Sequence, residues 1–249
     1  MTENQIKVSI ITACFNSEAT IKRTFESVLA QKDDIYEYII VDGGSTDSTL
    51  DIIKEYEPRF EGKMKVKSEP DCGIYDAINK GIKRCTGDLI GNINSDDWYE
   101  VGAIKEAASK IGSNPLQVIY GICRYIDGDG VEISASINSH NYLHKTMINH
   151  PSCFVTKAAY DKLGLYDTKY KAVADYDLML RYYNSKEVEF TPVYSVWANF
   201  VVTGTSYSYA GAKERYDFQL ANGTIGRAEY IYRVAGLKGL NFFRKLKKK

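Results

Sequence analysis

Leu89-Ile90-Gly91-Asn92-Ile93-Asn94-Ser95-Asp96-Asp97-Trp98 is the stretch of this 249-residue chain that decides its fold. Its apolar half predicts a buried strand, so Asp96 and Asp97 would lie where that strand leaves the sheet. Two adjacent acids repel each other unless a cation lies between them and a ligand. Hard oxygen ligands suit Mg²⁺ or Mn²⁺, and either ion can bind a diphosphate. Because acidic pairs are common, the prediction of a metal site depends on what the rest of the chain supplies.

Strand and helix patterns alternate over residues 1–115. Short apolar runs predict strands at 8–13, 38–41, 64–67 and 89–93, and amphipathic stretches predict helices at 18–31, 46–56, 74–84 and 103–111. This alternation predicts an α/β fold, with a mostly parallel sheet covered by helices on both faces. Ligands of such sheets bind beyond the carboxyl ends of the strands. The polar residues expected at those ends are Asn16, Asp42, Asp71, Asp96 and Asp97.

The pattern changes after residue 115. Strand patterns at 118–126 and 131–135 flank Asp127-Gly128-Asp129-Gly130, which is a strong hairpin signal. Further strands are expected at 150–157 and 193–202, with a short helix at 178–183 between them. Residues 116–210 therefore predict an antiparallel α+β half of the same domain. Residues 211–249 predict a helical segment, with breaks at Gly223, Gly226, Gly236 and Gly239.

The composition excludes several classes of protein. The formal net charge is zero, so no overall field favours nucleic acid as a partner. The five cysteines are odd in number, widely spaced and without a C-x-x-C pair, which argues against a disulfide framework or a zinc site. The polar N-terminus lacks the apolar core of a signal peptide, and no apolar run is long enough to span a bilayer. A cytoplasmic protein is expected.

The turn Asp42-Gly43-Gly44-Ser45-Thr46-Asp47 follows the second predicted strand. Its glycines permit close backbone approach, and the next helix offers free N–H groups to an anion. The alternative is a tight turn that Ser45 or Thr46 caps. The chain has neither G-x-G-x-x-G nor G-x-x-x-x-G-K-[ST], which argues against a dinucleotide fingerprint and a P-loop ATPase. Three polar strand ends, at 14–16, 42–47 and 94–97, are expected on one rim.

These pieces, in this order, resemble the family 2 glycosyltransferases with the GT-A fold, and most of all the small bacterial enzymes of surface-polysaccharide synthesis. The matching segments are 8–12 with Asn16, 41–47, 73–81, 87–88 and 94–97, and the resemblance ends at about Ser206. It implies that residues 1–115 bind a nucleotide sugar and that 116–210 form the acceptor side. It also implies inverting, Mn²⁺- or Mg²⁺-dependent transfer of a sugar, with UDP-sugars the first candidate donors, to a hydroxyl of a glycan.

The resemblance also implies roles for single residues. Asp42 would lie against the base or ribose, and Asn16 and Asp96 would help to hold the nucleotide. Relatives often carry a second acid at the next position, where this chain has Gly43, so Asp71 is the candidate for that contact. Asp96 and Asp97 match the family's metal-binding motif, with Asp97 favoured as the direct ligand. The metal would neutralise the leaving diphosphate.

Inverting transfer needs a carboxylate that deprotonates the acceptor hydroxyl. The segment Ala172-Val173-Ala174-Asp175-Tyr176-Asp177 resembles the family's acidic motif before a helix, where relatives usually have Glu-Asp. This alignment makes Asp175 the expected base. Asp177 is the alternative, and helix capping would be the purely structural interpretation of both.

Four other features bear on the site or on where the protein binds. His150 could lie near the acceptor or be structural, and Trp98 could lie under the sugar or fill the core. Gly204-Thr205-Ser206 resembles the family's flexible loop near the diphosphate. The last twelve residues carry six basic side chains and no acid. In the helical pattern of the tail 236–249, Leu237, Leu240, Phe243 and Leu246 fall on one side. They predict binding to anionic lipid at the inner membrane face, where a polyprenyl-diphosphate-linked acceptor would reside, or else a solvated tail.

Two other functions stay open at this point. A nucleotidyltransferase shares the sheet architecture and the acidic metal motif, although its first strand is normally followed by a glycine-rich basic loop. Here that loop is Ala13-Cys14-Phe15-Asn16-Ser17. The second is a non-catalytic protein that binds sugar nucleotides, against which the acidic pair and Asp175 argue.

Overall fold

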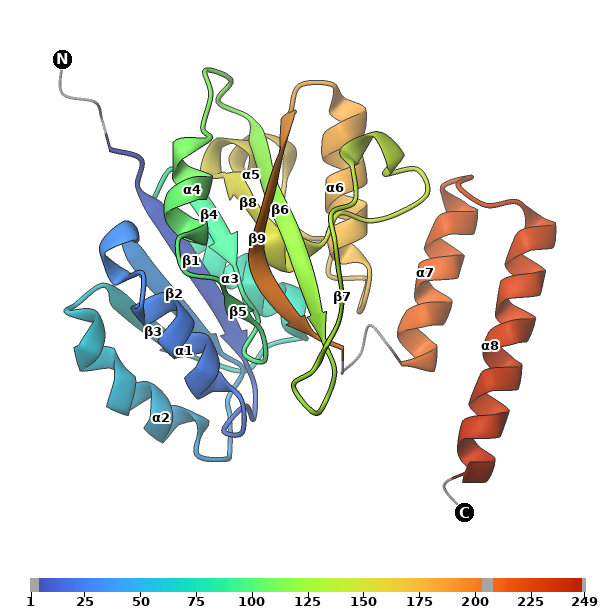
Figure 1. Ribbon diagram of the computed structural model, residues 1–249, viewed down its shortest axis with the longest axis horizontal. Coiled ribbons are helices and arrows are strands. Elements are labelled where there is room, and N and C mark those ends of the chain that lie inside the picture. Colours follow the sequence, from blue (N-terminus) through green and yellow to red (C-terminus); the bar gives the residue numbers. More distant parts are fainter. Residues whose placement is uncertain (1–4, 203–207, 248–249) are drawn as a thin grey trace.

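A nine-stranded mixed sheet with helices on both faces forms the body of the protein (Figure 1). The structure is a computed structural model that describes residues 5–202 and 208–247. Its strands are β1 (Val8–Cys14), β2 (Glu37–Asp42), β3 (Met64–Ser68), β4 (Leu89–Asn92), β5 (Trp98–Tyr99), β6 (Gln117–Ile126), β7 (Glu132–Ser136), β8 (Cys153–Thr156) and β9 (Glu189–Val201). Its helices are α1 (Ile21–Leu29), α2 (Thr49–Tyr56), α3 (Ile74–Arg84), α4 (Ala103–Ser109), α5 (Lys157–Leu163), α6 (Ala174–Ser185), α7 (Tyr209–Ala221) and α8 (Arg227–Lys247).

The first half of the chain forms the predicted parallel sheet. The strands lie in the order β3-β2-β1-β4, and each of the three pairs is parallel. Neighbouring residues of β1 enter different cores: Ile10 packs with α1, α2 and α4 on one face, and Ile11 packs with α3, α5 and α6 on the other. A strand that is buried on both faces must be apolar throughout, which explains the continuous apolar runs.

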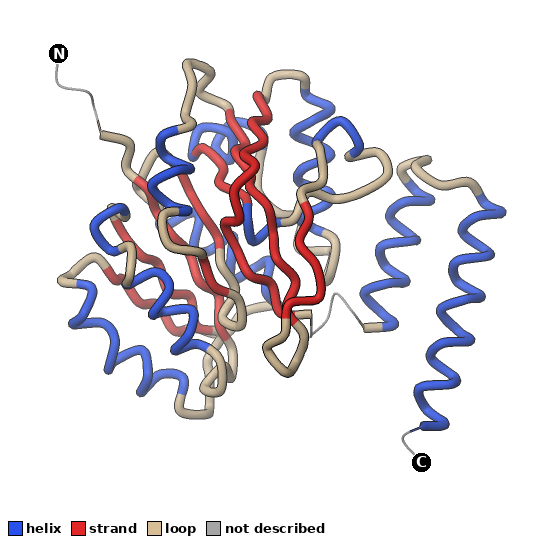
Figure 2. The backbone as a smooth tube through the Cα atoms, viewed as in Figure 1, coloured by secondary structure: helices blue, strands red, loops and turns tan. Residues whose placement is uncertain are grey.

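The second half extends the same sheet in the order β8-β6-β9-β5, with β7 paired to the free part of β6. β8 runs antiparallel to both β4 and β6, as the α+β prediction requires. β6 and β9 run parallel, as their arrows show (Figure 1), so the expectation of an antiparallel half is wrong for this pair. The two strands lie side by side in the sheet (Figure 2). The connection from β6 to β9 runs through β7, β8, α5 and α6, and a connection of this length lets the chain return in the parallel direction.

Several element boundaries differ from the predicted ones. The predicted strand 150–157 begins with a 3₁₀ turn at His150–Ser152, and helix α5 follows β8 directly. α6 begins at Ala174, four residues before the predicted start. The helical end breaks at Gly223, which has φ +67°, but α8 continues through Gly236 and Gly239. A glycine inside a helix costs only about 1 kcal/mol, which packing of α8 against α7 can offset.

The strands of the parallel half end at one edge. Cys14 is paired with Asp42, and Asp42 is paired in turn with Ser68. β4 ends nearby with Asn92, which precedes the acidic stretch. This edge therefore gathers the polar strand ends. Within the described ranges, no helix combines the length and the apolar character that a membrane span needs.

Candidate active site

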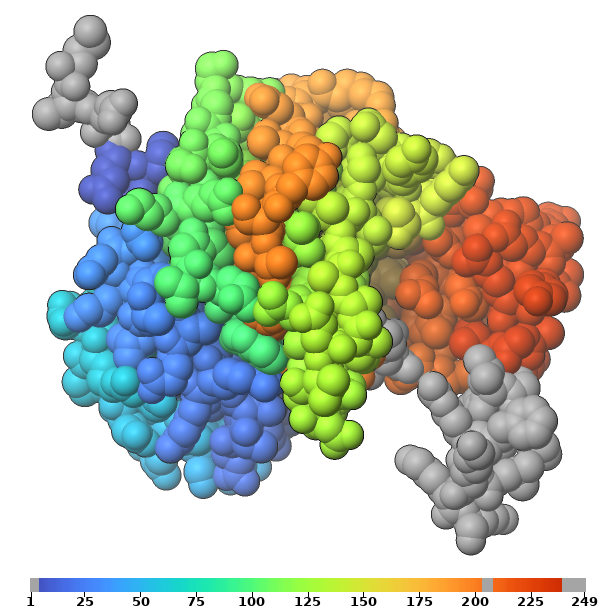
Figure 3. All heavy atoms as spheres, in the orientation of Figure 1, coloured from blue at the N-terminus to red at the C-terminus, as the bar shows by residue number. Residues whose placement is uncertain are grey.

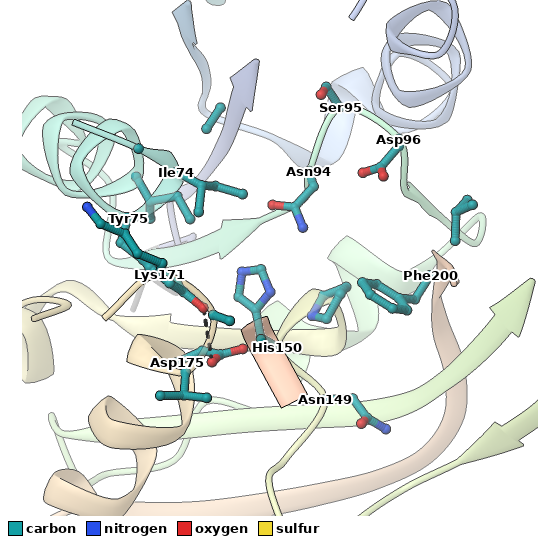
Figure 4. A pocket seen from close by; sticks show the side chains of 18 of the residues that line it. Ile74, Tyr75, Asn94, Ser95, Asp96, Asn149, His150, Lys171, Asp175 and Phe200 are labelled. Carbon is teal, nitrogen blue, oxygen red and sulfur yellow. Dashed lines mark hydrogen bonds between the residues drawn. The ribbon is translucent and has the colours of Figure 1, made fainter. Parts of the chain in front are cut away.

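A cleft of 1440 Å³ lies at this edge and reaches across both halves of the sheet. The first half contributes the turn after β1, the start of α3 and the acidic turn after β4. The second half contributes the 3₁₀ turn before β8, the start of α6 and one face of α7. Figure 4 shows Asn94 and Asp96 on one side of the cleft, Tyr75 and Lys171 on another, and Asp175 below them. The cleft therefore brings together side chains about 100 residues apart in the sequence.

Asp42 is fully buried at the end of β2 and fixes the turn that follows it. Its carboxylate accepts hydrogen bonds from the backbone N–H groups of Gly44 (3.0 Å) and Ser45 (3.1 Å) and from the Ser68 hydroxyl (2.6 Å). The Ser45 hydroxyl donates a further bond to it. The carboxylate thus shapes the turn from inside, and its expected contact with a nucleotide stays a prediction.

Asn16 joins the turns after β1 and β2. Its backbone is left-handed, with φ +48°, a conformation that asparagine tolerates better than most residues. Its N–H donates to Ser45 Oγ (2.8 Å), and its Oδ1 accepts from the N–H of Thr46 (2.8 Å). Asn16 lines the cleft, as a role in nucleotide binding requires, and that role stays a prediction.

Asp71 lies against Gly43, as its predicted role requires. A Cβ atom at position 43 would meet Asp71 Oδ2 at 2.5 Å, so the carboxylate occupies the space that an acidic side chain there would need. Asp71 Oδ1 is held by the N–H of Gly73 (2.8 Å). The exposed ring of Phe15 lies beside the same position, at 3.4 Å. Sequence reasoning missed Phe15, although an aromatic residue in a strand-end turn is a usable signal.

Asp96 and Asp97 differ in exposure. Asp96 is half-buried and lines the cleft; burial raises its pKa, and the charge of Arg23 counteracts that effect. Asp97 has no exposed surface. It accepts hydrogen bonds from the N–H of Val201 (2.9 Å) and from Asn94 Nδ2 (3.2 Å). Burial, and then the charge of Asp96, raise its pKa well above the ordinary value.

Arg23 supports this acidic turn from α1. Its guanidinium donates to the backbone oxygen of Asp96 (2.9 Å) and lies 3.8 Å from the centre of the Trp98 ring. Trp98 is therefore a platform for a cation at this turn. Sequence reasoning missed Arg23, because the contact spans more than 70 residues.

The acidic turn has donors that fit a hard divalent cation. Asn94 Oδ1 is buried and has no hydrogen-bond partner among the described residues, which is unusual for a buried oxygen. The described part of the chain holds no group of three or more His, Cys, Asp or Glu side chains that could bind a metal by itself. Mg²⁺ is commonly held by one or two carboxylates together with substrate phosphates. Asp96, which lines the cleft, fits that mode of binding, whereas Asp97 does not reach the cleft surface and its expected role as the direct ligand stays a prediction.

Asp175 lies in the first turn of α6 and faces the cleft, with 8% of its surface exposed. Its Oδ1 accepts hydrogen bonds from the Tyr75 hydroxyl (3.2 Å) and from the N–H of Tyr176 (2.9 Å). Burial raises the pKa of Asp175 to about 6, and these two bonds limit the rise. Asp177 does not line the cleft and pairs with Arg181 Nε at 2.8 Å.

Contacts between the two halves hold Asp175 in place. The Asn79 side chain of α3 exchanges two hydrogen bonds with the backbone of Tyr166, at 2.8 and 3.1 Å. Lys171 Nζ reaches across to the backbone oxygen of Cys72 (3.0 Å). Glu214 of α7 accepts from the N–H of Ala172 (2.6 Å), just before α6 begins. The base candidate is thus positioned by three separate segments.

His150 lies between Asn94 and Asp175 in the view of Figure 4. It is buried, and its Nε2 meets the Nδ2 of Asn92, so this nitrogen is the acceptor and the ring is neutral. Burial lowers the pKa of His150 to about 4. The residue lines the cleft, as its interpretation as a site residue requires. The predicted loop Gly204-Thr205-Ser206 lies outside the described residues.

A mixed α/β sheet with an acidic strand end in its cleft is the architecture of the GT-A glycosyltransferases. Residues 1–349 of S. aureus TarS, in complex with UDP-GlcNAc, share it with a TM-score of 0.67 over 93% of this chain and 71% of TarS 1–349, at 18% identity. The mannosyltransferase PcManGT from Pyrobaculum calidifontis, in complex with GDP-Man and Mn²⁺, has a TM-score of 0.66 over 95% of this chain and 70% of its own, at 14% identity. These likenesses confirm the expected GT-A fold.

Sequence comparison gives the family. A family model described as Glycosyl transferase family 2 matches residues 9–169, well over half of the chain. The chain therefore belongs to glycosyltransferase family 2, and the protein is a glycosyltransferase.

Curated relatives agree with this assignment. An uncharacterised glycosyltransferase of Mycobacterium tuberculosis is 33% identical over 182 residues, which cover 70% of this chain and 68% of the relative. A PGL/p-HBAD biosynthesis glycosyltransferase of Mycobacterium bovis is 28% identical over 71% of this chain and 70% of its own. The chondroitin synthase of Escherichia coli is 29% identical over 96% of this chain and 35% of its own.

Proposed function

We propose that the protein transfers a sugar from a nucleotide diphosphate donor to a hydroxyl of a glycan acceptor, with inversion and with a divalent cation. The observation that carries this proposal is that Asp96 of the first half and Asp175 of the second line the same cleft. Asp96 is available to the diphosphate of the donor, and Asp175 is available to the hydroxyl of the acceptor. The TarS and PcManGT complexes support a nucleotide-sugar donor.

Asp175 is suited to remove the acceptor proton. The hydrogen bonds from Tyr75 and Tyr176 both go to Oδ1, so Oδ2 is the oxygen left to receive a proton from the cleft. A general base works best when its pKa lies close to the operating pH, and the pKa of Asp175 is about 6. Asp177 is less suited, because Arg181 pairs with its carboxylate. The Tyr75 hydroxyl orients the base.

The nucleotide would lie on the rim that Asn16, Asp42 and Asp71 form, with Asp71 in place of the acid that Gly43 lacks. Asp96 and Asp97 would hold Mn²⁺ or Mg²⁺, with Asp96 the carboxylate that reaches the cleft surface. When bound, the cation would supply positive charge for the leaving diphosphate. Arg23, behind the acidic turn, offsets part of the carboxylate charge.

The acceptor proposed is a growing surface glycan on a polyprenyl diphosphate, at the inner face of the cell membrane. Polysaccharide synthesis agrees with the chondroitin synthase relationship, and the basic C-terminal sequence would bind anionic lipid. α8 extends to Lys247, but its side chains beyond Lys238 lie outside those described.

The first experiment measures thermal stability with UDP, GDP, CDP and dTDP, each with and without Mn²⁺. A ligand at ~100 times its Kd stabilises a fold by about 2.7 kcal/mol, which a melting curve resolves. We expect a shift with UDP that requires the metal. Transfer is then assayed as release of nucleoside diphosphate. Asp96→Asn and Asp175→Asn should abolish release, whereas Asp177→Asn, the matched control, should retain it; pyrophosphate release would instead indicate nucleotidyl transfer.

A further inference from the structure

A group of four cations lines the wall of the cleft near α7 and α8: Lys145, Lys171, Arg215 and Arg233. The strand-edge part of the lining has mixed charge, with Glu18, Asp76 and Asp96 beside Lys22 and Arg23. α7 and α8 form one flank of the molecule, on the side of α6 away from α1 and α2 (Figures 1 and 3). Binding of the metal and the donor explains the acids at the strand edge, but neither explains the four cations near α7 and α8.

One face of α7 points into the cleft. Gly211, Arg215 and Gln219 are spaced four residues apart, so they lie on the same side of the helix, and all three line the cleft. Gln219 is buried, donates to the backbone oxygen of Lys145 (3.3 Å), and its Oε1 has no partner among the described residues. This contact brings the Lys145 loop and the Arg215 face of α7 together.

Arg215 also lies near the base. Burial raises the pKa of Tyr176, which follows Asp175 directly, and the charge of Arg215 counteracts this rise. The Arg215 guanidinium therefore acts on the part of the cleft wall that adjoins Asp175.

Three of the four cations have no carboxylate partner among the described residues. Arg233 pairs with Glu229 (2.6 Å), and Lys171 donates to Cys72, but neither Lys145 nor Arg215 forms an ion pair with a described residue. The adjacent acid, Glu214, is used by the backbone N–H groups before α6. Unpaired cations in a cleft attract anions, because its low-dielectric walls focus their field.

We propose that Arg215 and Lys145 form a subsite for an anionic group of the acceptor, a phosphate or a carboxylate, while its hydroxyl lies at Asp175. The assignment rests on the proposed function, since it takes Asp175 as the acceptor side of the cleft. Two sources share this chemistry: the diphosphate of a lipid carrier and the carboxylate of an acidic sugar. A neutral glycan would leave both cations unused.

The test compares Arg215→Ala and Lys145→Ala with the wild type in a transfer assay. The acceptors are one sugar on a short prenyl diphosphate, the same sugar on a neutral alkyl chain, and a uronic acid on that alkyl chain. We expect the KM of one anionic acceptor to rise about tenfold in each variant, as the loss of a charge-assisted contact implies. The KM of the neutral acceptor and the Kd of UDP with Mn²⁺ should each change less than about twofold.

The controls separate this proposal from loss of fold and from failure of the proposed function. Lys105→Ala removes an exposed α4 cation outside the cleft and should leave every value unchanged, and Arg215→Lys should restore part of the affinity. If no acceptor supports transfer, calorimetry with inorganic pyrophosphate and with glucuronate, without metal, still tests the subsite. If Arg215→Ala binds pyrophosphate or glucuronate more weakly than the wild type, the subsite is supported. If the variant binds both ligands as well as the wild type, or loses UDP affinity to the same extent, the subsite is overturned.

Discussion

Asp175→Asn should make the protein more stable at pH 8 while it removes the proposed base. Burial raises the pKa of Asp175 from 3.8 to about 6, so the folded state holds this proton more tightly than the unfolded chain does. The resulting stabilisation is present below pH 3.8 and is lost as the pH rises through about 6. The difference between the two pKa values corresponds to about 3 kcal/mol. Asparagine does not ionise and keeps an oxygen for Tyr75 and Tyr176, so it avoids this cost.

The assay is urea unfolding of the wild type and Asp175→Asn at two pH values. From the same pKa values, the advantage of the variant should be about 3 kcal/mol at pH 8 and about 1 kcal/mol at pH 4.5. Asp177→Asn is the matched control: it loses the pair with Arg181 and should be destabilised by about 0.5 kcal/mol. An advantage that is absent at pH 8, or equal at both pH values, would refute the reasoning that Asp175 ionises at a cost inside the fold.

Three further predictions concern single positions. Tyr75→Phe removes a donor to the α6 carboxylate and should move the acid limb of kcat/KM upward by about one pH unit; an unmoved limb would show that the hydroxyl does not tune the base. Gly43→Ala places a methyl group 2.5 Å from Asp71 Oδ2 and should weaken UDP binding by about tenfold in calorimetry, whereas an unchanged Kd would take Asp71 out of the nucleotide site. Gly121→Ala places a methyl group 2.5 Å from the buried ring of Trp197 and should cost about 1–3 kcal/mol in urea unfolding without altering UDP affinity, and a neutral result would mean that the core can repack.

The parallel half of the fold was predictable because its signals are local. Strands β1, β2 and β4 are largely apolar runs, whereas β3 alternates Met64 and Val66 with lysines. The helices are amphipathic, and a parallel sheet brings the strand ends to one edge. The parallel pairing of β6 with β9 was not predictable in this way, since it depends on a long connection through β7, β8, α5 and α6. Helix α5 was missed because it follows β8 without a turn; only its first residue, Lys157, lay within the expected strand 150–157.

The site was predictable where one segment carries the chemistry. The acidic turn lines the cleft as expected, whereas no residue of the turn 42–47 after β2 does. The cleft lining also separates Asp175 from Asp177, which the sequence left open. Tyr75, Arg23 and Arg215 were missed, because each acts on a residue far away along the chain. No local pattern marks such a partner. The expected contacts of Asp42 and Asp97 stay predictions, since the hydrogen bonds of both carboxylates lie within the fold.

Cys72 gives the protein a natural position for chemical labelling. It is exposed and lines the cleft, whereas Cys14, Cys85, Cys123 and Cys153 are buried and burial raises the pKa of each. Because the thiolate is the species that reacts, a maleimide should modify Cys72 well before the other four. A fluorophore attached there would sit next to the Lys171 bridge between the two halves. The unmodified sequence thus offers an optical reporter of ligand binding in the cleft, without the cysteine replacements that such experiments usually require.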